Sequence, residues 1–308
     1  LKDPEGKPLT ARQIPGRGTA YAILAEVYAW IAGYGQEPEY YALGIEAAGK
    51  VIGDPNYRLV ASPEEVCTEV LAGNSAEGIF EVCYDDSRGE YKDFGSYIGG
   101  TVEKWPVLKG TTPASRRKFF IRNETVERLY TPEDLRLQAY FADFFRMKEE
   151  PVSVTQGAAY VRMWREVEYY SGGIYDGTPR TLLANDILIR LPDILLLRAE
   201  MKAATGDREG AVADLDVVRR RAGVAGYSEA EGDLRRAIQL ERDRELLFQT
   251  GVRYFDYMRN HTYNLLKGGF RDLTETDVAA GALFLPVSLD AMNNNPKVKQ
   301  TAYWVGKF

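Results

Sequence analysis

The chain has 308 residues, of which 45% are hydrophobic, 27% charged and 12% aromatic. This balance predicts a folded globular protein of one large or two closely packed domains, and it excludes a disordered or collagen-like chain. The 45 acidic residues outnumber the 39 basic ones, and the net charge of −6 argues against nucleic acid as a partner.

A helical hairpin is predicted near the start of the chain. Apolar residues recur at helical spacing over residues 19–31, and a second helix is predicted over residues 38–52. Thr19 is the predicted N-cap of the first helix, because its hydroxyl can accept a hydrogen bond from a free backbone N–H. The most apolar stretches of the chain, residues 20–30 and 187–197, do not approach the roughly 20 uncharged residues that a membrane span needs.

The two cysteines are Cys67 and Cys83. Two are too few for a disulfide scaffold, and their spacing is not that of a C-x-x-C zinc or redox site. We expect both to be ordinary small apolar residues, with a disulfide between them as the alternative.

The stretch over residues 84–180 differs in character from its flanks. It is rich in Gly, Pro, Thr and Ser, and its aromatic residues are enriched roughly twofold over the rest of the chain. We predict a loop-rich segment with short strands in or beside it, at residues 78–83, 118–122 and 160–169. One helix is predicted inside it, over residues 132–145.

A second helical hairpin is predicted downstream, over residues 193–205 and 209–221. Its Ala199 and Glu200 match Ala25 and Glu26 of the first hairpin, and small alanines at matched places let helices approach closely. Such matches are typical of tetratricopeptide-type repeats. Chance similarity between two amphipathic hairpins is the alternative.

The C-terminal part is predicted to begin with one long helix, residues 233–261, and to end in a turn-rich tail, residues 286–308. The predicted fold class is mainly α, with tetratricopeptide-like helical hairpins packed with a loop-rich segment that contains a few short strands. We divide the chain into a helical-repeat part, residues 1–77, and a C-terminal ligand-binding and scaffold part, residues 78–308.

The sequence carries no recognisable catalytic motif. His261 is the single histidine, no G-x-S-x-G elbow occurs, and the glycine-rich stretches lack the spacing of phosphate-binding loops. Glu241 and Glu245 are the candidates for a glycoside hydrolase pair, but the arginines around them would lower rather than raise a carboxyl pKa. We therefore expect ion pairs there, and we predict no catalytic residue, no cofactor and no metal. A calcium site is the alternative for an acidic cluster that breaks the EF-hand pattern, formed by Asp85, Asp86, Glu90 and Asp93.

A sugar has apolar C–H faces and a rim of hydroxyl groups, so its site needs flat aromatic rings beside planar or charged hydrogen-bonding groups. The glycine-containing stretch over residues 85–105 has this composition. The predicted ligand-binding residues are Arg88, Tyr91, Tyr97 and Trp105, with Trp164 and Tyr175 as further candidates. The alternative is that these rings fill a core beneath a long loop, which is the role we expect for Phe119, Phe120, Phe144 and Phe145.

Three ordered motifs resemble those of the SusD/RagB family of outer-membrane nutrient-binding lipoproteins. They are similar to the family's AE…LN-x-V-R-x-RAG pattern, its ER-x-x-EL…EG-x-R-x-x-D helix and its P…NP…QN-x-x-Y ending. Asp216 replaces the family's Asn, and Thr250 and Tyr257 are further departures. The matching residues are Ala199, Glu200 and 215–223; then 241–246, Gly251, Arg253 and Asp256; and finally Pro286, Asn295, Pro296 and 300–303.

The resemblance implies a mainly α fold in which helical hairpins form a scaffold beneath a loop-rich ligand-binding part. It further implies a non-enzymatic protein, lipid-anchored at the outer membrane and cell surface, that hands oligosaccharides to a SusC-like TonB-dependent transporter. Peptides, as in the RagB branch, are the alternative cargo, and a scaffold that binds only protein is a third alternative.

The family's lipidated cysteine and N-terminal helical region have no counterpart in the sequence. We therefore expect the chain to be the C-terminal portion of a longer protein. The matching motifs belong to the scaffold, so the predicted ligand contacts rest on composition alone.

Overall fold

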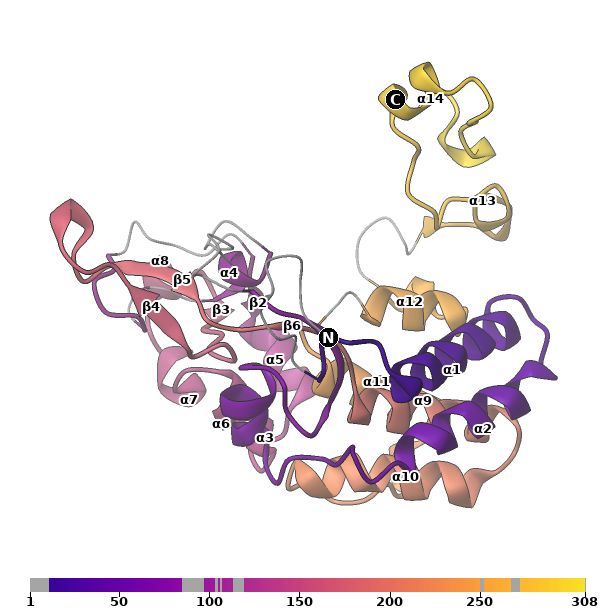
Figure 1. Cartoon of the computed structure of the whole chain (residues 1–308), viewed down its shortest axis with the longest axis horizontal. Coiled ribbons are helices and arrows are strands. Elements are labelled where there is room, and N and C mark those ends of the chain that lie inside the picture. The colour runs from indigo at the N-terminus through magenta and orange to yellow at the C-terminus, as the bar shows by residue number, and fades with distance from the viewer. Residues whose placement is uncertain are drawn as a thin grey trace.

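The computed structural model describes residues 11–84, 97–102, 105, 107–112, 119–249, 252–266 and 272–307. Helices dominate these residues and the strands are short, which confirms the predicted fold class. Figure 1 shows the longest helices packed together at one end of the molecule, with most of the short strands at the other. No helix in these ranges is both long enough and apolar enough to cross a membrane.

The first predicted hairpin is confirmed by helices α1 (Arg17–Gly33) and α2 (Tyr40–Ile52). The N-cap of α1 is Gly16 and not Thr19, because the helix begins before the predicted residue. The hydroxyl of Thr19 instead accepts the backbone N–H of Gly16 at 3.3 Å, from inside the first turn. The prediction of a polar cap was therefore wrong in position, although the threonine still satisfies a backbone donor of this turn.

Helices α9 (Leu191–Ala204) and α10 (Arg208–Arg221) confirm the second predicted hairpin. Helix α9 contacts both α10 and α2, so the two hairpins stack with α2 and α9 in the middle. Ala199 of α9 and Ala48 of α2 are completely buried, as expected where small side chains allow helices to approach closely.

The long helix predicted over residues 233–261 is wrong, because two helices occupy this stretch: α11 (Leu234–Glu245) and α12 (Val252–Arg259). Arg242 of α11 donates from Nε to Asp256 of α12 at 2.6 Å. In one straight helix these two residues would be about 21 Å apart along the axis. The chain turns back between the helices, where Phe248 adopts a left-handed φ of 59°.

In the described part of the chain, six short strands form three separate antiparallel pairs. Strand β1 (Gly78–Val82) pairs with β6 (Asp186–Arg190), β2 (Ile121–Arg122) with β3 (Ala158–Ala159), and β4 (Val167–Tyr169) with β5 (Pro179–Leu182). The strand predicted over residues 78–83 is confirmed. The other two predictions were too long, since only their last two or three residues are in strands.

The helix predicted over residues 132–145 is also interrupted. Helices α6 (Leu135–Tyr140) and α7 (Phe144–Met147) follow α5 (Asn123–Leu129). Between α6 and α7, Phe141 is extended, completely buried and paired with Val161 in an isolated antiparallel bridge. Burial of this ring across the bridge stops α6 before the predicted end.

The shorter helical elements lie mostly in the loop-rich part and in the C-terminal tail. Figure 1 shows the tail, with α13 and α14, standing above the body beyond α12. These elements are α3 (Pro63–Glu65), η1 (Val66–Val70), α4 (Tyr97–Thr101), α8 (Val152–Thr155), η3 (Gly173–Tyr175), η4 (Glu229–Glu231), η5 (Tyr263–Leu265), α13 (Glu275–Ala279), α14 (Leu289–Asn294) and η7 (Ala302–Trp304).

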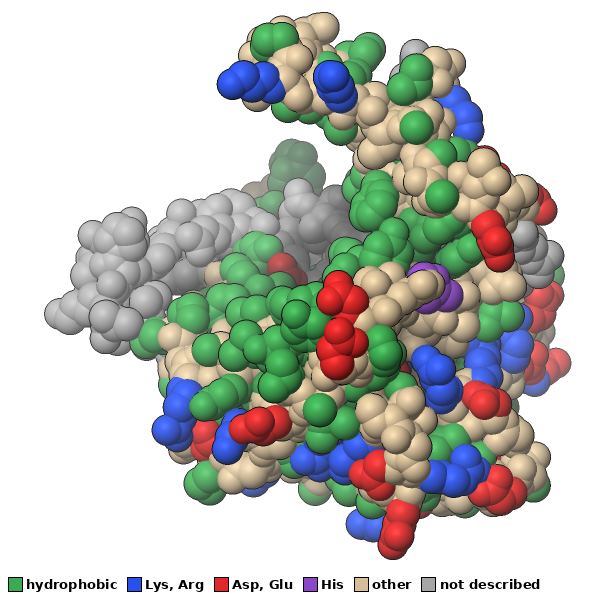
Figure 2. Space-filling model, turned by 90° about the vertical axis from the view of Figure 1, so that its right-hand side faces the viewer, with side chains coloured by type: hydrophobic (Ala, Val, Ile, Leu, Met, Phe, Trp, Pro, Cys, Tyr) green, Lys and Arg blue, Asp and Glu red, His purple; other side chains and the backbone are tan. Residues whose placement is uncertain are grey.

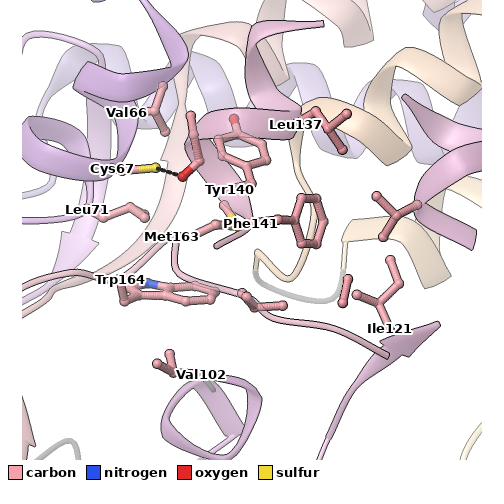
Figure 3. Close-up of a cluster of buried hydrophobic side chains, with 14 of the residues drawn as sticks. Val66, Cys67, Leu71, Val102, Ile121, Leu137, Tyr140, Phe141, Met163 and Trp164 are labelled. Atoms are coloured by element: carbon pink, nitrogen blue, oxygen red, sulfur yellow. Dashed lines mark hydrogen bonds between the residues drawn. The ribbon is translucent and has the colours of Figure 1, made fainter. Parts of the chain in front are cut away.

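One hydrophobic core lies between the helices of the two hairpins and α11, and a second lies inside the loop-rich part. Figure 3 shows the second, where Trp164, Met163 and Phe141 lie against each other below Cys67. The thiol of Cys67 points to the carbonyl oxygen of Ala139 at 3.5 Å. Cys67 is buried and Cys83 is partly exposed, and no disulfide joins the two, so the alternative of a Cys67–Cys83 pair does not hold.

Candidate functional site

Only some of the predicted ligand-binding residues fall within the described part of the chain. Arg88 and Tyr91 lie outside it, as do the members of the acidic cluster, Asp85, Asp86, Glu90 and Asp93. Tyr97 is the first residue of α4, and its side chain is outside the described part too. Trp105, Trp164 and Tyr175 are described.

Trp164 is not available to a ligand. Its side chain is 2% exposed and belongs to the core of the loop-rich part, where it packs near Val102 and Met163 (Figure 3). Composition could not distinguish this ring from an exposed one, because a loop-rich segment buries some of its rings in the core beneath it. We therefore remove Trp164 from the candidate site.

Tyr175 lies at the tip of the hairpin formed by β4 and β5, which projects at the far left of Figure 1. Its ring is 59% exposed and its centroid is 5.7 Å from that of Tyr170, another exposed ring. Ile174 between them is almost fully exposed. The tip therefore presents two neighbouring aromatic rings and an aliphatic side chain to the surroundings.

The turn that carries these rings is held by its own hydrogen bonds. The N–H of Gly177 donates to the carbonyl of Tyr170 at 2.9 Å, and the N–H of Tyr170 donates to the carbonyl of Thr178 at 2.9 Å. The N–H of Gly172 donates to the carboxylate of Asp176 at 2.6 Å. These hydrogen bonds already order the turn before a ligand arrives. Little conformational entropy of the turn is therefore lost when a ligand binds to the rings.

The segment over residues 107–112 runs beside this hairpin. Val107 packs against Met147 and Tyr160 of a small hydrophobic cluster. Gly110 lies so close to the hairpin tip that a Cβ there would overlap the carbonyl oxygen of Gly177. Trp105, two residues before Val107 in the sequence, is half-buried.

Phenylalanines assigned to the core from sequence divide between core and surface. Phe144 is buried, but Phe119, Phe120 and Phe145 are each almost half exposed, so the prediction was wrong for these three. The guanidinium of Arg122 lies over the ring of Phe120, 5.6 Å from its centroid. Phe119 and Phe120 precede the two-residue strand β2, and Phe145 lies in the four-residue helix α7. Such short elements cannot cover both faces of a large side chain.

We define the aromatic surface as Tyr170, Ile174 and Tyr175 of the hairpin tip, together with Trp105, which only the sequence assigns to it. Sequence reasoning found Trp105 and Tyr175 but missed Tyr170 and Ile174. The missed signal was the glycine spacing at Gly172, Gly173 and Gly177, which is typical of a tight hairpin turn between two short strands. Aromatic rings on such a turn can stack on the C–H face of a sugar.

The two carboxylates suspected of glycoside hydrolysis are inside the molecule. Glu241 accepts from Arg136 Nη1 at 2.6 Å, and Glu245 accepts from Arg190 Nη1 at 2.6 Å and also from Arg221. Both glutamates are 0% exposed. An oligosaccharide could not reach them without unfolding of this region.

The pKa values of these carboxyls also oppose an acid role. Burial alone raises the pKa of Glu241, but Arg136, Arg244 and Arg219 outweigh it and bring the pKa below its ordinary value. Burial also raises the pKa of Glu245, but Arg221, Arg190 and Arg136 outweigh it and together hold this pKa at about 2. A general acid needs a raised pKa, so the structure supports the ion-pair interpretation of both residues.

A cavity of about 460 Å³ opens beside this network. Four of its charged groups pair with each other: Arg219 with Glu231 at 2.8 Å and Arg136 with Asp134 at 2.8 Å. No aromatic ring lines it, so it lacks the stacking platform of a sugar site. The lining residues are Leu129, Thr131, Glu133, Asp134, Arg136, Arg219, Gly223, Val224, Ala225, Glu231 and Arg244. Within the described ranges, no three His, Cys, Asp or Glu side chains gather as ligands for a metal.

Comparisons with known proteins identify relatives of this fold. The SusD family model matches residues 76–304. A SusD homolog from Bacteroides thetaiotaomicron VPI-5482 superposes with a TM-score of 0.77 and 22% identity, over 99% of this chain and 62% of that one. No curated protein matches the sequence.

Two further similar structures carry a functional name. Surface glycan-binding protein A from Bacteroides thetaiotaomicron has a TM-score of 0.64 and 20% identity, over 93% of this chain and 64% of that one. A structure of the same protein in complex with laminarihexaose has a TM-score of 0.63 and 20% identity, over 92% and 64%. The chain therefore spans less than two thirds of the length of these structures.

Proposed function

Since this chain belongs to the SusD family, we propose that it is a non-enzymatic nutrient-binding protein that captures oligosaccharides at the cell surface. The single observation that carries this proposal is the exposed pair of rings, Tyr170 and Tyr175, on a hydrogen-bonded turn. A similar fold in surface glycan-binding protein A, one structure of which contains laminarihexaose, supports the choice of glycan as ligand.

The aromatic surface is the proposed contact site. Each ring that stacks on a sugar adds about 0.5–1.5 kcal/mol beyond the area it buries, so a few rings give modest affinity. Modest affinity suits a protein that must release its cargo. Arg88, Tyr91 and Tyr97 stay part of the proposal as further contacts, on composition alone.

We propose a SusC-like TonB-dependent transporter in the outer membrane as the receiver of the cargo, and a lipid anchor as the means of attachment. Both follow from the resemblance to the SusD/RagB family. A protein that holds its cargo without cleaving it also fits the burial of Glu241 and Glu245, the two carboxylates suspected of hydrolysis.

Isothermal titration calorimetry with laminarihexaose, maltohexaose, cellohexaose, xylohexaose and a mixture of unmodified hexapeptides tests the proposal. We expect binding to at least one glycan and an affinity loss of about twofold to tenfold for Tyr175→Ala, the equivalent of one stacking ring. Trp105→Ala and Tyr170→Ala should show losses of similar size.

The matched control is Phe255→Ala, which removes an equally exposed ring from α12 at the opposite end of the molecule. It should leave glycan affinity unchanged. Unchanged affinity in all three variants of the aromatic surface would contradict the site, and binding of peptides without any glycan would contradict the cargo.

A further inference from the structure

Carboxylates neutralise most arginines in the described part of the chain. They do so at the surface, where Arg146 pairs with Asp143 at 2.5 Å, and in the interior, where Arg242 pairs with Asp256 at 2.6 Å. Figure 2 shows Lys and Arg side chains intermingled with Asp and Glu on one face of the molecule. An exposed arginine that is held in place without a carboxylate is therefore a candidate contact for an anion that a ligand brings.

Arg122 is such an arginine. It is the second residue of β2, in which Ile121 belongs to the core and Arg122 is exposed, because successive residues of a strand point to opposite faces. Both residues pair with β3, and the N–H of Asn123 donates to the carbonyl of Gly157 at 3.0 Å. The backbone of Arg122 is therefore fixed on both sides, while its guanidinium forms no hydrogen bond or ion pair with the described residues.

The ring of Phe120 supports this guanidinium. The guanidinium lies over the ring, 5.6 Å from its centroid, and the ring is 45% exposed. A guanidinium that stacks on a ring keeps the N–H groups along its edge for hydrogen bonds. In the other arginine–ring pairs that the structure describes, the arginine also bonds a carboxylate, an amide or a carbonyl. These pairs are Arg12–Tyr57, Arg136–Tyr130, Arg208–Tyr227, Arg236–Tyr257 and Arg253–Tyr257.

Phe120 and Arg122 lie beside a segment for which the sequence predicts ligand contacts. The N–H of Phe119 donates to the carbonyl of Gly100 at 2.9 Å, which joins the residues before β2 to α4. Tyr97, one of the predicted contacts, is the first residue of α4. Figure 1 shows α4 and β2 close together in the loop-rich part, away from the tip of the β4–β5 hairpin. Phe120 and Arg122 are therefore separate from the aromatic surface but belong to the same part of the molecule.

We propose that Phe120 and Arg122 form a subsite for an acidic sugar, in which the guanidinium binds the carboxylate of a uronic acid. The exposed part of the ring packs against the C–H groups of the same sugar. The inference rests on the proposed function and adds a class of glycan to it.

The chemistry of the two side chains favours this class. The edge of a guanidinium matches a carboxylate with two parallel N–H···O bonds, and such bonds are roughly twice as strong as those to a neutral hydroxyl. A uronic acid carries its carboxylate on a rigid ring with an apolar face, so one sugar can contact both groups. An acidic peptide fits less well, because its carboxylates are on flexible side chains without such a face.

Calorimetry with acidic glycans and their uncharged counterparts tests the subsite. The probes are hexamers of galacturonate and of mannuronate, each beside its methyl ester, and a hyaluronan hexasaccharide. We expect at least one acid to bind about tenfold more tightly than a neutral probe, and Arg122→Gln to remove this advantage without weakening the ester. Arg122→Lys keeps the charge but not the fork, so we expect it to lose about threefold.

The matched control is Arg128→Gln. Arg128 is an exposed arginine of α5, six residues further on, and it lies over no ring in the described part of the chain. This variant should keep the preference for the acid. Phe120→Ala should weaken the acid and its ester alike, by about twofold to tenfold, because the ring contacts the part that the two ligands share. Melting temperatures of all variants should match that of wild type, which shows that the fold is intact.

Four results would overturn the subsite. They are failure of every acidic hexamer to bind, equal affinity for acid and ester in wild type, a preference for the acid that survives Arg122→Gln, and its loss in Arg128→Gln. A sulfated oligosaccharide that binds more tightly than every uronate and needs Arg122 would assign the subsite to sulfate instead. Hexaglutamate with the same property would assign it to an acidic peptide.

Failure of the subsite can be distinguished from failure of the proposed function. If neutral glycans bind and lose affinity in Tyr175→Ala while no uronate depends on Arg122, the acidic subsite is wrong and the proposed function stands. If neither neutral nor acidic glycans bind, the proposed function is wrong and the subsite with it.

Discussion

Arg136 of α6 and Glu241 of α11 are joined by an ion pair of 2.6 Å in which both side chains are 0% exposed. This pair connects the loop-rich part to the hairpin scaffold. Arg136 also holds Asp134 at 2.8 Å, and Glu245 extends the network to Arg190 and Arg221. Buried ion pairs therefore hold the two parts of the molecule together, in addition to apolar packing.

Removing Arg136 should leave buried carboxylates without a partner. We expect Arg136→Met to lower the free energy of unfolding by about 3–5 kcal/mol, the usual cost of breaking a buried ion pair from one side. Urea denaturation followed by circular dichroism measures it. The control is Arg146→Met, which breaks exposed pairs with Asp143 and Glu150 and should cost less than about 1 kcal/mol. Equal costs for the two variants would contradict the structural role of the network.

Acid should weaken the same network. The pKa of Glu245 is about 2 in the folded chain, below its ordinary value of 4.5. A depressed carboxyl pKa stabilises the fold above the unfolded-state value, and the stabilisation is lost as pH falls from about 4.5 toward 2. The loss is of the order of 3 kcal/mol for this group.

Urea titrations between pH 2 and pH 7 measure this dependence. The free energy of unfolding should fall steeply below pH 4.5, and the slope should be smaller in Glu245→Gln, whose side chain does not titrate. An unchanged slope in the variant would show that the acid sensitivity originates elsewhere.

Glu26 should have the opposite pH dependence. Burial, assisted by Asp193, raises the pKa of Glu26 from 4.5 to about 7. A raised carboxyl pKa gives stability that is fully present below about pH 4.5 and is lost as pH rises toward 7. Glu26→Gln removes this titration and should stabilise the 308-residue chain at pH 8 relative to pH 5.

The expected gain is about 1 kcal/mol, discounted because a third of the Glu26 side chain is exposed and water screens its charge. Melting temperatures of wild type and Glu26→Gln at pH 5 and pH 8 measure it. Glu46→Gln is the control, because Glu46 of α2 is an exposed glutamate in an ion pair with Lys50. Parallel pH profiles for wild type and Glu26→Gln would refute the expectation.

Both helical hairpins could be predicted from sequence because their signal is local. The apolar spacing along α1, α2, α9 and α10 is set by contacts one helical turn apart. The break between α11 and α12 could not be predicted, because it depends on Arg242 meeting Asp256 across the turn. The same holds for Phe141, whose partner Val161 is distant in sequence. The division of the chain at residue 77 stays a prediction.

The candidate site could be predicted only in part. Aromatic composition selected both Trp105 and Trp164, but one ring is half-buried at the surface and the other is in the core. Composition shows which aromatic residues are present. Whether a given ring is buried depends on residues that are distant in the sequence and pack against it in the fold. Tyr170 meets Tyr175 only because β4 and β5 pair, so neither residue alone predicts the contact.

The close approach of Gly110 to the hairpin tip makes a sharp prediction about the aromatic surface. Gly110 has a φ of +67°, and a Cβ there would overlap the carbonyl oxygen of Gly177. Gly110→Ala should therefore displace the hairpin and weaken glycan binding together with stability. The matched control is Gly157→Ala, because Gly157 has a φ of +68° but no atom within 4 Å of the added Cβ.

Gly157→Ala should cost only the backbone strain of a left-handed alanine, about 1–2 kcal/mol, and should leave glycan affinity unchanged. Gly110→Ala should cost more, because overlap with backbone cannot be relieved by rotating a side chain. Urea denaturation of the two variants measures the loss of stability, and calorimetry measures their glycan affinity. Together they distinguish backbone strain at the substituted residue from displacement of the hairpin tip. Equal losses of stability in the two variants, with full glycan affinity in both, would contradict this prediction. Residues 107–112 would then not support the hairpin tip through the contact between Gly110 and Gly177.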